Sequence, residues 1–133
     1  MYLLDTNIFL EYILKRDHLE EVRGFFHRAD LSRLYVSDFS LHTLGVIFLK
    51  AHKPQDFLQF VNEDVLASGI RILPLLPEDY QLLTDVSTRY RLDFDDAYQY
   101  AVAEKHALSV VSFDRDFDRT DKGRKLPGDL FRE

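Results

Sequence analysis

The chain opens with Met1-Tyr2-Leu3-Leu4-Asp5-Thr6-Asn7, where a short apolar run ends abruptly in a carboxylate, a hydroxyl and an amide. Apolar residues at nearly helical spacing follow over residues 8–14. An apolar strand followed at once by an amphipathic helix is typical of the first unit of a parallel α/β fold. Because ligands bind beyond the carboxyl ends of such strands, Asp5 stands where a functional residue is expected. The alternative is that Asp5 or Thr6 only caps the helix.

Size and composition limit the possible classes of protein. The 133 residues are enough for one core, so we expect a single domain over residues 1–133. No apolar run is long enough to span a bilayer and no signal peptide is recognisable, so we expect a cytoplasmic protein. Cysteine is absent, which excludes disulfides and thiolate metal sites. The net charge of −6 opposes general attraction to nucleic acid, so nucleic-acid binding would need a local basic patch.

Strand-like and helix-like patterns alternate along the whole chain. Further strands are expected at residues 34–37, 70–73 and 108–112, and a short edge strand near Leu130-Phe131. Helical spacing is expected at residues 19–29, 38–49, 54–66, 77–90 and 94–107. This order predicts a three-layer α/β/α, Rossmann-like fold with a mainly parallel central sheet. If the first strand is central, Asp5 lies at the middle of the sheet edge.

Three groups of acidic residues stand where strands end or a helix begins. They are Asp5 after the first strand, Asp93, Asp95 and Asp96 at the start of a helix, and Asp114, Asp116 and Asp118 after the last strand. Taken singly, each group is explained by helix capping or by ordinary surface charge. Carboxylates collected in one cleft repel each other unless a cation joins them. Mg²⁺ and similar hard ions take oxygen ligands, so the three groups together predict a divalent-metal site.

Three blocks in order resemble the signature motifs of PIN domains, with the strongest likeness to the small, single-domain VapC-type toxins. The blocks are Leu4-Asp5-Thr6-Asn7-Ile8-Phe9-Leu10, then Asp96-Ala97, then Val111-Ser112-Phe113-Asp114-Arg115-Asp116-Phe117. No single block is specific, but their order and the helical segments between them extend the resemblance over essentially the whole chain.

The resemblance implies a metal-dependent endoribonuclease that uses Mg²⁺ or Mn²⁺, cuts RNA, and is the toxin partner of a small antitoxin protein. It also allows a homodimer and implies no association with a membrane. The implied catalytic and metal-ligating carboxylates are Asp5, Asp96 and Asp114, with Asp116 as a further metal ligand. Asn7 and Ser112 are implied to orient ligands or water, and Asp118 is a supporting residue. Metal-activated water would attack the RNA phosphodiester.

One position departs from the family pattern. The family usually has Ser-x-x-Thr-x-x-Glu in the helix after the second strand, and this chain has Ser37, Ser40 and Thr43 there. The usual fourth acid is therefore replaced by Thr43. The alternative function is a catalytically weakened or inactive PIN-fold module that binds RNA or a protein partner. A phosphatase of the haloacid dehalogenase type is disfavoured, because Asn7 occupies the position where that chemistry needs a second acid.

Two further features predict partners. A basic run could contact RNA, although a solvated tail explains it as well; it comprises Arg115, Arg119, Lys122, Arg124 and Lys125. The chain also has eleven Phe and seven Tyr, and aromatic residues are frequent in the first four helical segments. We therefore expect a hydrophobic groove on those helices that accepts an antitoxin segment or a second copy of the chain.

Overall fold

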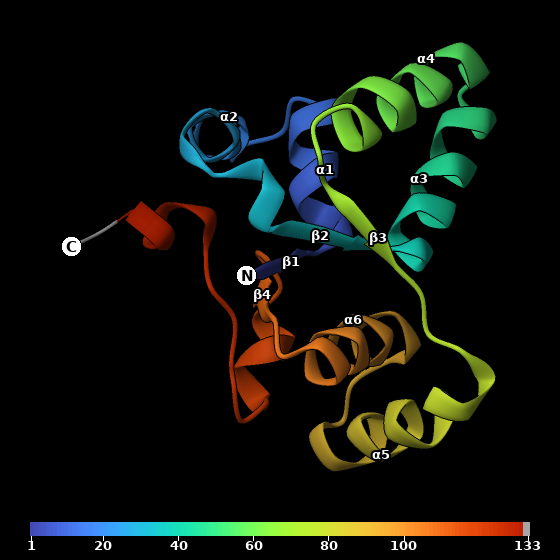
Figure 1. Ribbon diagram of the computed structural model, residues 1–133, viewed down its shortest axis with the longest axis vertical. Helices are drawn as coiled ribbons and strands as arrows, with labels where there is room; N and C mark the ends of the chain where they lie inside the picture. The colour runs from blue at the N-terminus through green and yellow to red at the C-terminus, as the bar shows by residue number, and fades with distance from the viewer. Residues whose placement is uncertain (132–133) are drawn as a thin grey trace.

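A computed structural model describes residues 1–131, and its centre is a parallel sheet of four strands in the order β3-β2-β1-β4 (Figure 1). The strands are β1 (Tyr2–Leu4), β2 (Leu34–Ser37), β3 (Arg71–Leu73) and β4 (Ser109–Val111). Strand β1 pairs with both β2 and β4, so that Leu4 lies opposite Val36 on one side and Val111 on the other. The predicted parallel sheet is confirmed, and the first strand lies in its interior.

Helices cover both faces of this sheet (Figure 1). On one face lie α1 (Thr6–Ile13), α2 (Leu19–Arg28), α3 (Asp38–Lys50) and α4 (Pro54–Gln59); on the other lie α5 (Tyr80–Tyr90) and α6 (Phe94–His106). Successive strand residues point to opposite faces. Leu3 accordingly packs in the core cluster with α5 and α6, while Leu4 packs in the cluster with α1 to α3. The three-layer α/β/α fold is thus confirmed.

Three of these helices begin at a polar residue that caps the helix N-terminus. Asp5 caps α1 by accepting a hydrogen bond from the Thr6 amide at 2.7 Å. The Ser37 hydroxyl caps α3, and the Asp93 carboxylate caps α6 by accepting from the Asp96 amide at 3.0 Å. These caps satisfy amide donors that have no partner inside the helix. They also start each helix directly at the sheet edge, which places acidic side chains of the first helical turns there.

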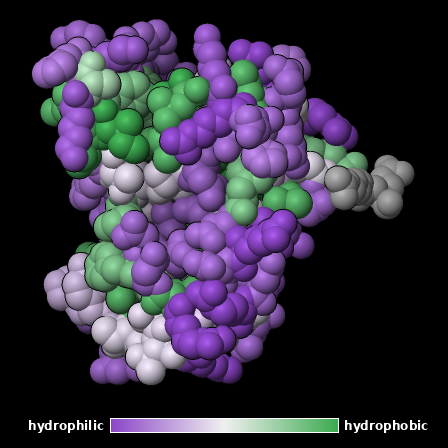
Figure 2. All heavy atoms as spheres, turned by 180° about the vertical axis from the view of Figure 1, so that it is seen from behind, coloured by the Kyte–Doolittle hydropathy of each residue, from purple (hydrophilic) through white to green (hydrophobic). Residues whose placement is uncertain are grey.

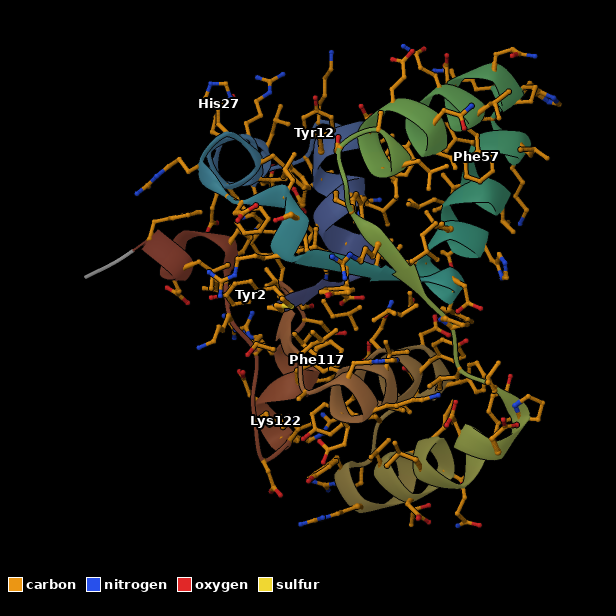
Figure 3. The ribbon with its side chains drawn as sticks, viewed as in Figure 1. Tyr2, Tyr12, His27, Phe57, Phe117 and Lys122 are labelled. Atoms are coloured by element: carbon orange, nitrogen blue, oxygen red, sulfur yellow. The ribbon has the colours of Figure 1, made fainter. Side chains whose placement is uncertain are left out.

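The α3–α4 pair packs closely because of one glycine. A Cβ atom added at Gly45 would lie 3.0 Å from Cζ of Phe57, so any larger residue would require the ring of Phe57 to shift. Phe57 lies between α3 and α4 in Figure 3, with its ring 5.8 Å from that of Phe48. The helix then continues as π-helical turns over Phe60–Leu66.

The chain's last described segment differs from the expectation. Leu130 and Phe131 do not form an edge strand but belong to a 3-10 helix over Pro127–Phe131. The ring of Phe131 packs against Phe25 of α2 at 6.0 Å, beneath the guanidinium of Arg28. Edge pairing occurs earlier, where the Lys125 backbone bonds to residues of β4 and just beyond. Proline lacks an amide donor for a ladder, which explains why the pairing stops before Pro127.

No helix among the described residues combines the length and the apolar character that crossing a bilayer requires.

Candidate metal centre

A pocket of about 230 Å³ lies where β1 and β4 end and α6 begins. Its lining residues are Asp5, Thr6, Asn7, Leu10, Phe39, Thr43, Asp95, Asp96, Gln99 and Asp114. They come from α1, α3, α6 and the two strand ends, so distant parts of the chain meet here. Thr43, at the position of the missing acid, is one of them.

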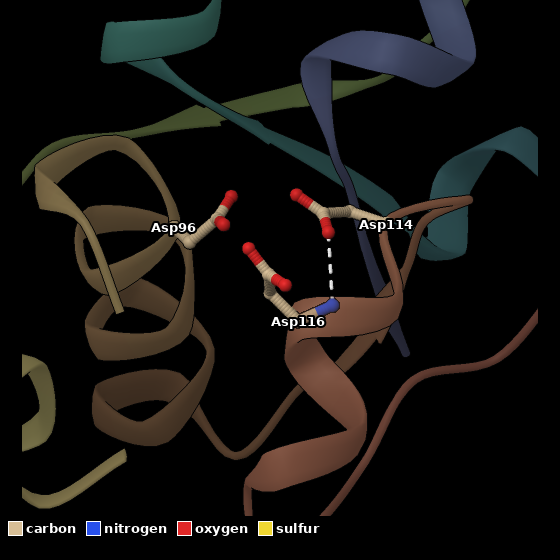
Figure 4. Close-up of side chains that lie close together, drawn as sticks. All are labelled: Asp96, Asp114 and Asp116. Atoms are coloured by element: carbon tan, nitrogen blue, oxygen red, sulfur yellow. Dashed lines mark hydrogen bonds between the residues drawn. The ribbon is translucent and has the colours of Figure 1, made fainter. Parts of the chain in front are cut away.

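Three carboxylates converge at this pocket. Asp96, Asp114 and Asp116 each offer an oxygen, and these oxygens all lie within 4.8 Å of one another. Figure 4 shows Asp96 pointing from the first turn of α6 towards the segment after β4, which carries the other two acids. Oδ1 of Asp114 accepts a hydrogen bond from the Asp116 amide at 2.9 Å, which fixes the turn between them. The structure therefore brings together three of the four acids expected to bind metal.

Burial and nearby negative charges raise the pKa of two acids at this site, Asp96 and Asp5. Burial raises the pKa of Asp96 to about 8, helped by the negative charges of Asp114 and Asp93 and by a hydrogen bond shared with Asp114. Burial likewise raises the pKa of Asp5 to about 6, although hydrogen bonds from Ser112 and the Thr6 amide oppose the rise. Each side chain is less than one-tenth exposed. Without a cation, the site therefore retains protons close to neutral pH.

The Ser112 hydroxyl connects Asp5 to the acidic turn. It donates to Oδ2 of Asp5 at 2.6 Å and accepts from the Asp114 amide at 2.9 Å and from Nδ2 of Asn7 at 3.1 Å. Asp5 itself is outside the group of three converging carboxylates, but it lines the same pocket and contributes to the raised pKa of Asp96. Ser112 and Asn7 thus form hydrogen bonds within the site, and their role in orienting ligands or water stays a prediction.

Gln99 is a site residue that the sequence analysis did not single out. It is 1% exposed, and its Nε2 donates to the Ser40 hydroxyl at 2.6 Å. Its Oε1 is buried and has no hydrogen-bond partner among the described residues. Gln99 follows Asp96 by one helical turn, so the spacing of the two on one helix face is the signal that could have revealed it.

The donor set fits a hard divalent cation. Asp96, Asp114 and Asp116 supply carboxylate oxygens within 4.8 Å of one another. Gln99, whose buried Oε1 has no hydrogen-bond partner among the described residues, also lines the pocket. Oxygen-only donor sets suit Mg²⁺ and Mn²⁺ better than softer metals. The guanidinium of Arg119, 3.0 Å from Oδ1 of Asp116, offsets part of the negative charge.

The other predicted site residues do not belong to this cluster, although Arg119 contacts it through Asp116. Asp118 is exposed and forms an ion pair with Arg124 at 3.1 Å. Arg119 pairs with Asp116, and Lys122 pairs with Glu104 at 3.5 Å (Figure 3). Three of the five basic residues expected to contact RNA are therefore partly neutralised by nearby acids, while Arg115 and Lys125 are exposed. The run does not form an uninterrupted basic patch.

An apolar groove lies on α3 and α4, as expected from the aromatic helices. Its volume is about 660 Å³, and Val46, Leu49 and Leu58 in its wall are each more than half exposed. Figure 2 shows apolar side chains gathered in the upper part of the face seen from behind, where these helices lie. A smaller apolar pocket of about 130 Å³ lies between α1, α2 and the π-helical turns. Both surfaces suit an apolar partner segment.

Residues 2–123 match the family described as PIN domain. A search of curated proteins returned no significant match.

Several solved structures share this fold over nearly their full length. The crystal structure of FitAcB from Neisseria gonorrhoeae aligns with a TM-score of 0.79 at 22% identity, covering 96% of this chain and 98% of that one. A toxin–antitoxin complex from Klebsiella pneumoniae aligns with a TM-score of 0.77 at 20% identity, covering 96% and 98%. VapC20 from Mycobacterium tuberculosis, a toxin that cleaves the sarcin–ricin loop, aligns with a TM-score of 0.78 at 13% identity, covering 96% and 100%.

Proposed function

The chain belongs to the PIN domain family, and we propose that it is a metal-dependent endoribonuclease, the toxin of a toxin–antitoxin pair. The observation that carries this proposal is the convergence of Asp96, Asp114 and Asp116 within 4.8 Å at the carboxyl edge of a parallel sheet. Repelling carboxylates held together in this way are suited to hold a divalent cation. The toxin VapC20, which shares the fold, supports RNA as the substrate class.

Each site residue has a distinct role in the proposal. Asp96, Asp114 and Asp116 would hold Mg²⁺ or Mn²⁺, and Asp5 would complete the catalytic set beside them. The bound ion supplies an activated water and neutralises charge on the scissile phosphate. The Ser112 hydroxyl holds the Asp5 carboxylate and the Asp114 backbone in place. Asn7 orients the Ser112 hydroxyl and reaches the Phe113 amide at 3.4 Å.

An antitoxin partner is the second part of the proposal. Two proteins with this fold come from a toxin–antitoxin complex and from FitAB bound to DNA. The α3–α4 groove offers Val46, Leu49 and Leu58 to an apolar segment. We place an antitoxin segment in this groove and the pair in the cytoplasm. A second copy of the chain is the competing occupant.

One observation favours a different function. Thr43 lines the pocket where the family usually has an acid, so the site has one carboxylate fewer. A weakened site would retain RNA or partner binding without efficient cleavage. The second candidate is therefore a PIN-fold module that binds RNA or a protein and does not cut.

RNA cleavage with Mn²⁺ separates the two candidates. The wild-type chain should cut a mixed-sequence RNA, and Asp96→Asn should abolish cutting because Asp96 belongs to the converging cluster. Asp95→Asn is the matched control: Asp95 lines the pocket but does not belong to the cluster, so most activity should remain. RNA binding without cleavage by the wild-type chain would favour the second candidate. Equal loss of activity in both variants would contradict the assignment of Asp96.

Co-expression tests the partner. The product of the gene next to this one should co-purify with the chain, and Leu49→Asp should release it by placing a charge in the groove. Leu66→Asp is the control, because Leu66 is equally exposed but does not line the groove. Release by both variants, or by neither, would argue against this groove as the antitoxin site.

A further inference from the structure

Phe39 lines the acidic pocket and packs against two further aromatic rings. The ring of Phe39, which lines the pocket, lies 5.7 Å from the ring of Phe94 and 5.2 Å from the ring of Tyr98. Phe94 and Tyr98 are 6.0 Å apart. Phe94 occupies the first position of α6, two residues before Asp96, and 50% of its surface is exposed. The exposed ring of Phe94 is thus connected, through Phe39, to the pocket that Asp96 and Asp114 line.

Tyr98 supports the rings of Phe39 and Phe94 and is itself held in place by two hydrogen bonds. The Tyr98 hydroxyl donates to Oδ1 of Asp38 at 2.7 Å and accepts from the Leu75 amide at 3.0 Å. Tyr98 is buried, and Phe39 and Phe94 pack on it. An exposed phenylalanine that is fixed in this way presents a ring face with little loss of side-chain freedom on binding. Aromatic groups of this kind provide affinity at low entropic cost.

The described residues of the basic run offer RNA limited electrostatic attraction, since only Arg115 and Lys125 are exposed outside the ion pairs. The net charge of the chain is −6, and Arg119, Lys122 and Arg124 are paired with acids. Phosphate contacts normally supply most of the affinity of nucleic-acid-binding proteins. Contacts with the bases must then contribute more here. Stacking on aromatic side chains is the usual source of such affinity for single strands, and it tolerates any base because every base has a π-face.

We propose that the exposed ring of Phe94, supported by Phe39, forms a stacking platform that binds an unpaired nucleobase of RNA near the phosphate at the carboxylate cluster. The proposal rests on the proposed function for the identity of the polymer. Because a duplex keeps its bases stacked on one another, the platform selects single-stranded or looped RNA. Phe94 and Phe39 are positioning residues in this scheme, and the cutting chemistry belongs to the aspartates.

The absence of tryptophan from the chain makes a direct test possible. In Phe94→Trp, on an Asp96→Asn background that prevents cutting, the added indole is the only one and reports on the platform. A twelve-nucleotide single-stranded RNA should quench its fluorescence. An abasic ribose-phosphate oligomer of the same length, which has the phosphates but no bases, should not. Leu66→Trp is the control, because Leu66 is 54% exposed and lines neither the site pocket nor the groove.

Binding measurements on the same background complete the test. Phe94→Ala should weaken RNA binding by about five- to 150-fold, the range found when one stacked base loses its partner. It should leave binding of the abasic oligomer unchanged, and Leu66→Ala should change neither. Equal quenching by RNA and by the abasic oligomer would overturn the proposal, as would equal effects of Phe94→Ala and Leu66→Ala. Trp emission that changes with protein concentration without RNA would mean that a second copy covers the platform, and would also overturn it.

These outcomes are separate from those of the proposed function. If the chain cuts RNA but shows no base-dependent quenching, the proposed function stands and the platform proposal is overturned. A chain that shows base-dependent quenching but does not cut retains the platform and is a binding module.

Discussion

The Ser112 hydroxyl donates a hydrogen bond of 2.6 Å to Oδ2 of Asp5, although the two residues are 107 positions apart in the sequence. The bond joins the ends of β1 and β4, which are neighbours in the sheet. The same oxygen accepts from the Asp114 amide, so one buried hydroxyl ties the first acid of the chain to the last acidic turn. The relative positions of the two ends of the site therefore depend on one side chain.

Removing this hydroxyl should damage the site and the fold together. Ser112→Ala leaves Oδ2 of the buried Asp5 carboxylate without its donor and the Asp114 amide without an acceptor. Buried groups left unpaired typically cost about 1–3 kcal/mol, so urea unfolding should show a loss of this order. Ser112→Thr keeps the hydroxyl and should lose much less. A loss that is the same in both variants would mean that space, and not the hydrogen bonds, matters at this position.

The metal-free protein should become less stable as pH rises. The pKa of Asp96 is about 8 and that of Asp5 about 6 in the folded chain, both above the ordinary 3.8. At a pH between 3.8 and the folded-state pKa, the folded state holds protons that the unfolded state has released. The two protonated acids therefore contribute fully to the stability of the fold below about pH 4, and this contribution is lost as pH rises through 6 to 8. Thermal melts in chelator from pH 5 to 8.5 measure the effect.

Two comparisons check the cause of this pH dependence. Asp96→Asn removes the group with the largest shift, so its melting temperature should change less over the same range. Mn²⁺ should stabilise the wild-type chain more at pH 8 than at pH 5, because the metal competes with protons for the same oxygens. A wild-type melting temperature that rises with pH in chelator would contradict the assignment.

Restoring the missing acid should strengthen metal binding. Thr43 lines the pocket with Asp5 and Asp96, so Thr43→Glu adds a carboxylate to the same cavity. Calorimetry should show Mn²⁺ binding tighter by on the order of tenfold, since affinity for hard cations follows the number of charged oxygen ligands. The side chain introduced by Thr43→Gln has the shape of glutamate without its charge, so this variant should not tighten Mn²⁺ binding. Unchanged affinity in Thr43→Glu would mean that another residue has taken over the role.

Two acids on the same turn, Asp116 and Asp118, should differ sharply in their contribution to Mn²⁺ binding. Asp116 contributes an oxygen to the converging cluster, whereas Asp118 is exposed and pairs with Arg124. Asp116→Asn should weaken Mn²⁺ binding by on the order of tenfold. Asp118→Asn should change it less than about twofold, because exposed ion pairs contribute little. Equal effects on Mn²⁺ affinity would contradict this division of roles.

Local patterns determined the elements of this protein and the places of its acids. The alternation of short apolar runs with helical spacing predicts the parallel sheet, and Asp5, Ser37 and Asp93 begin their helices as the sequence indicates. Such features depend on residues within a few positions of one another, so the local sequence is enough to predict them. The carboxyl ends of parallel strands share one edge of the sheet, which is why the acids after β1 and β4 could be predicted to approach each other.

Only the tertiary structure decided how these elements meet. Where α3 meets α6, Phe39 lies beside Phe94 and Gln99 bonds to Ser40. No spacing in the sequence predicts these contacts. The same holds for the ion pairs that neutralise Arg119 and Lys122, and for the contact with α2 that turns Phe131 away from the sheet. Each of these contacts depends on the positions of side chains from different elements after packing, and local propensity does not encode those positions.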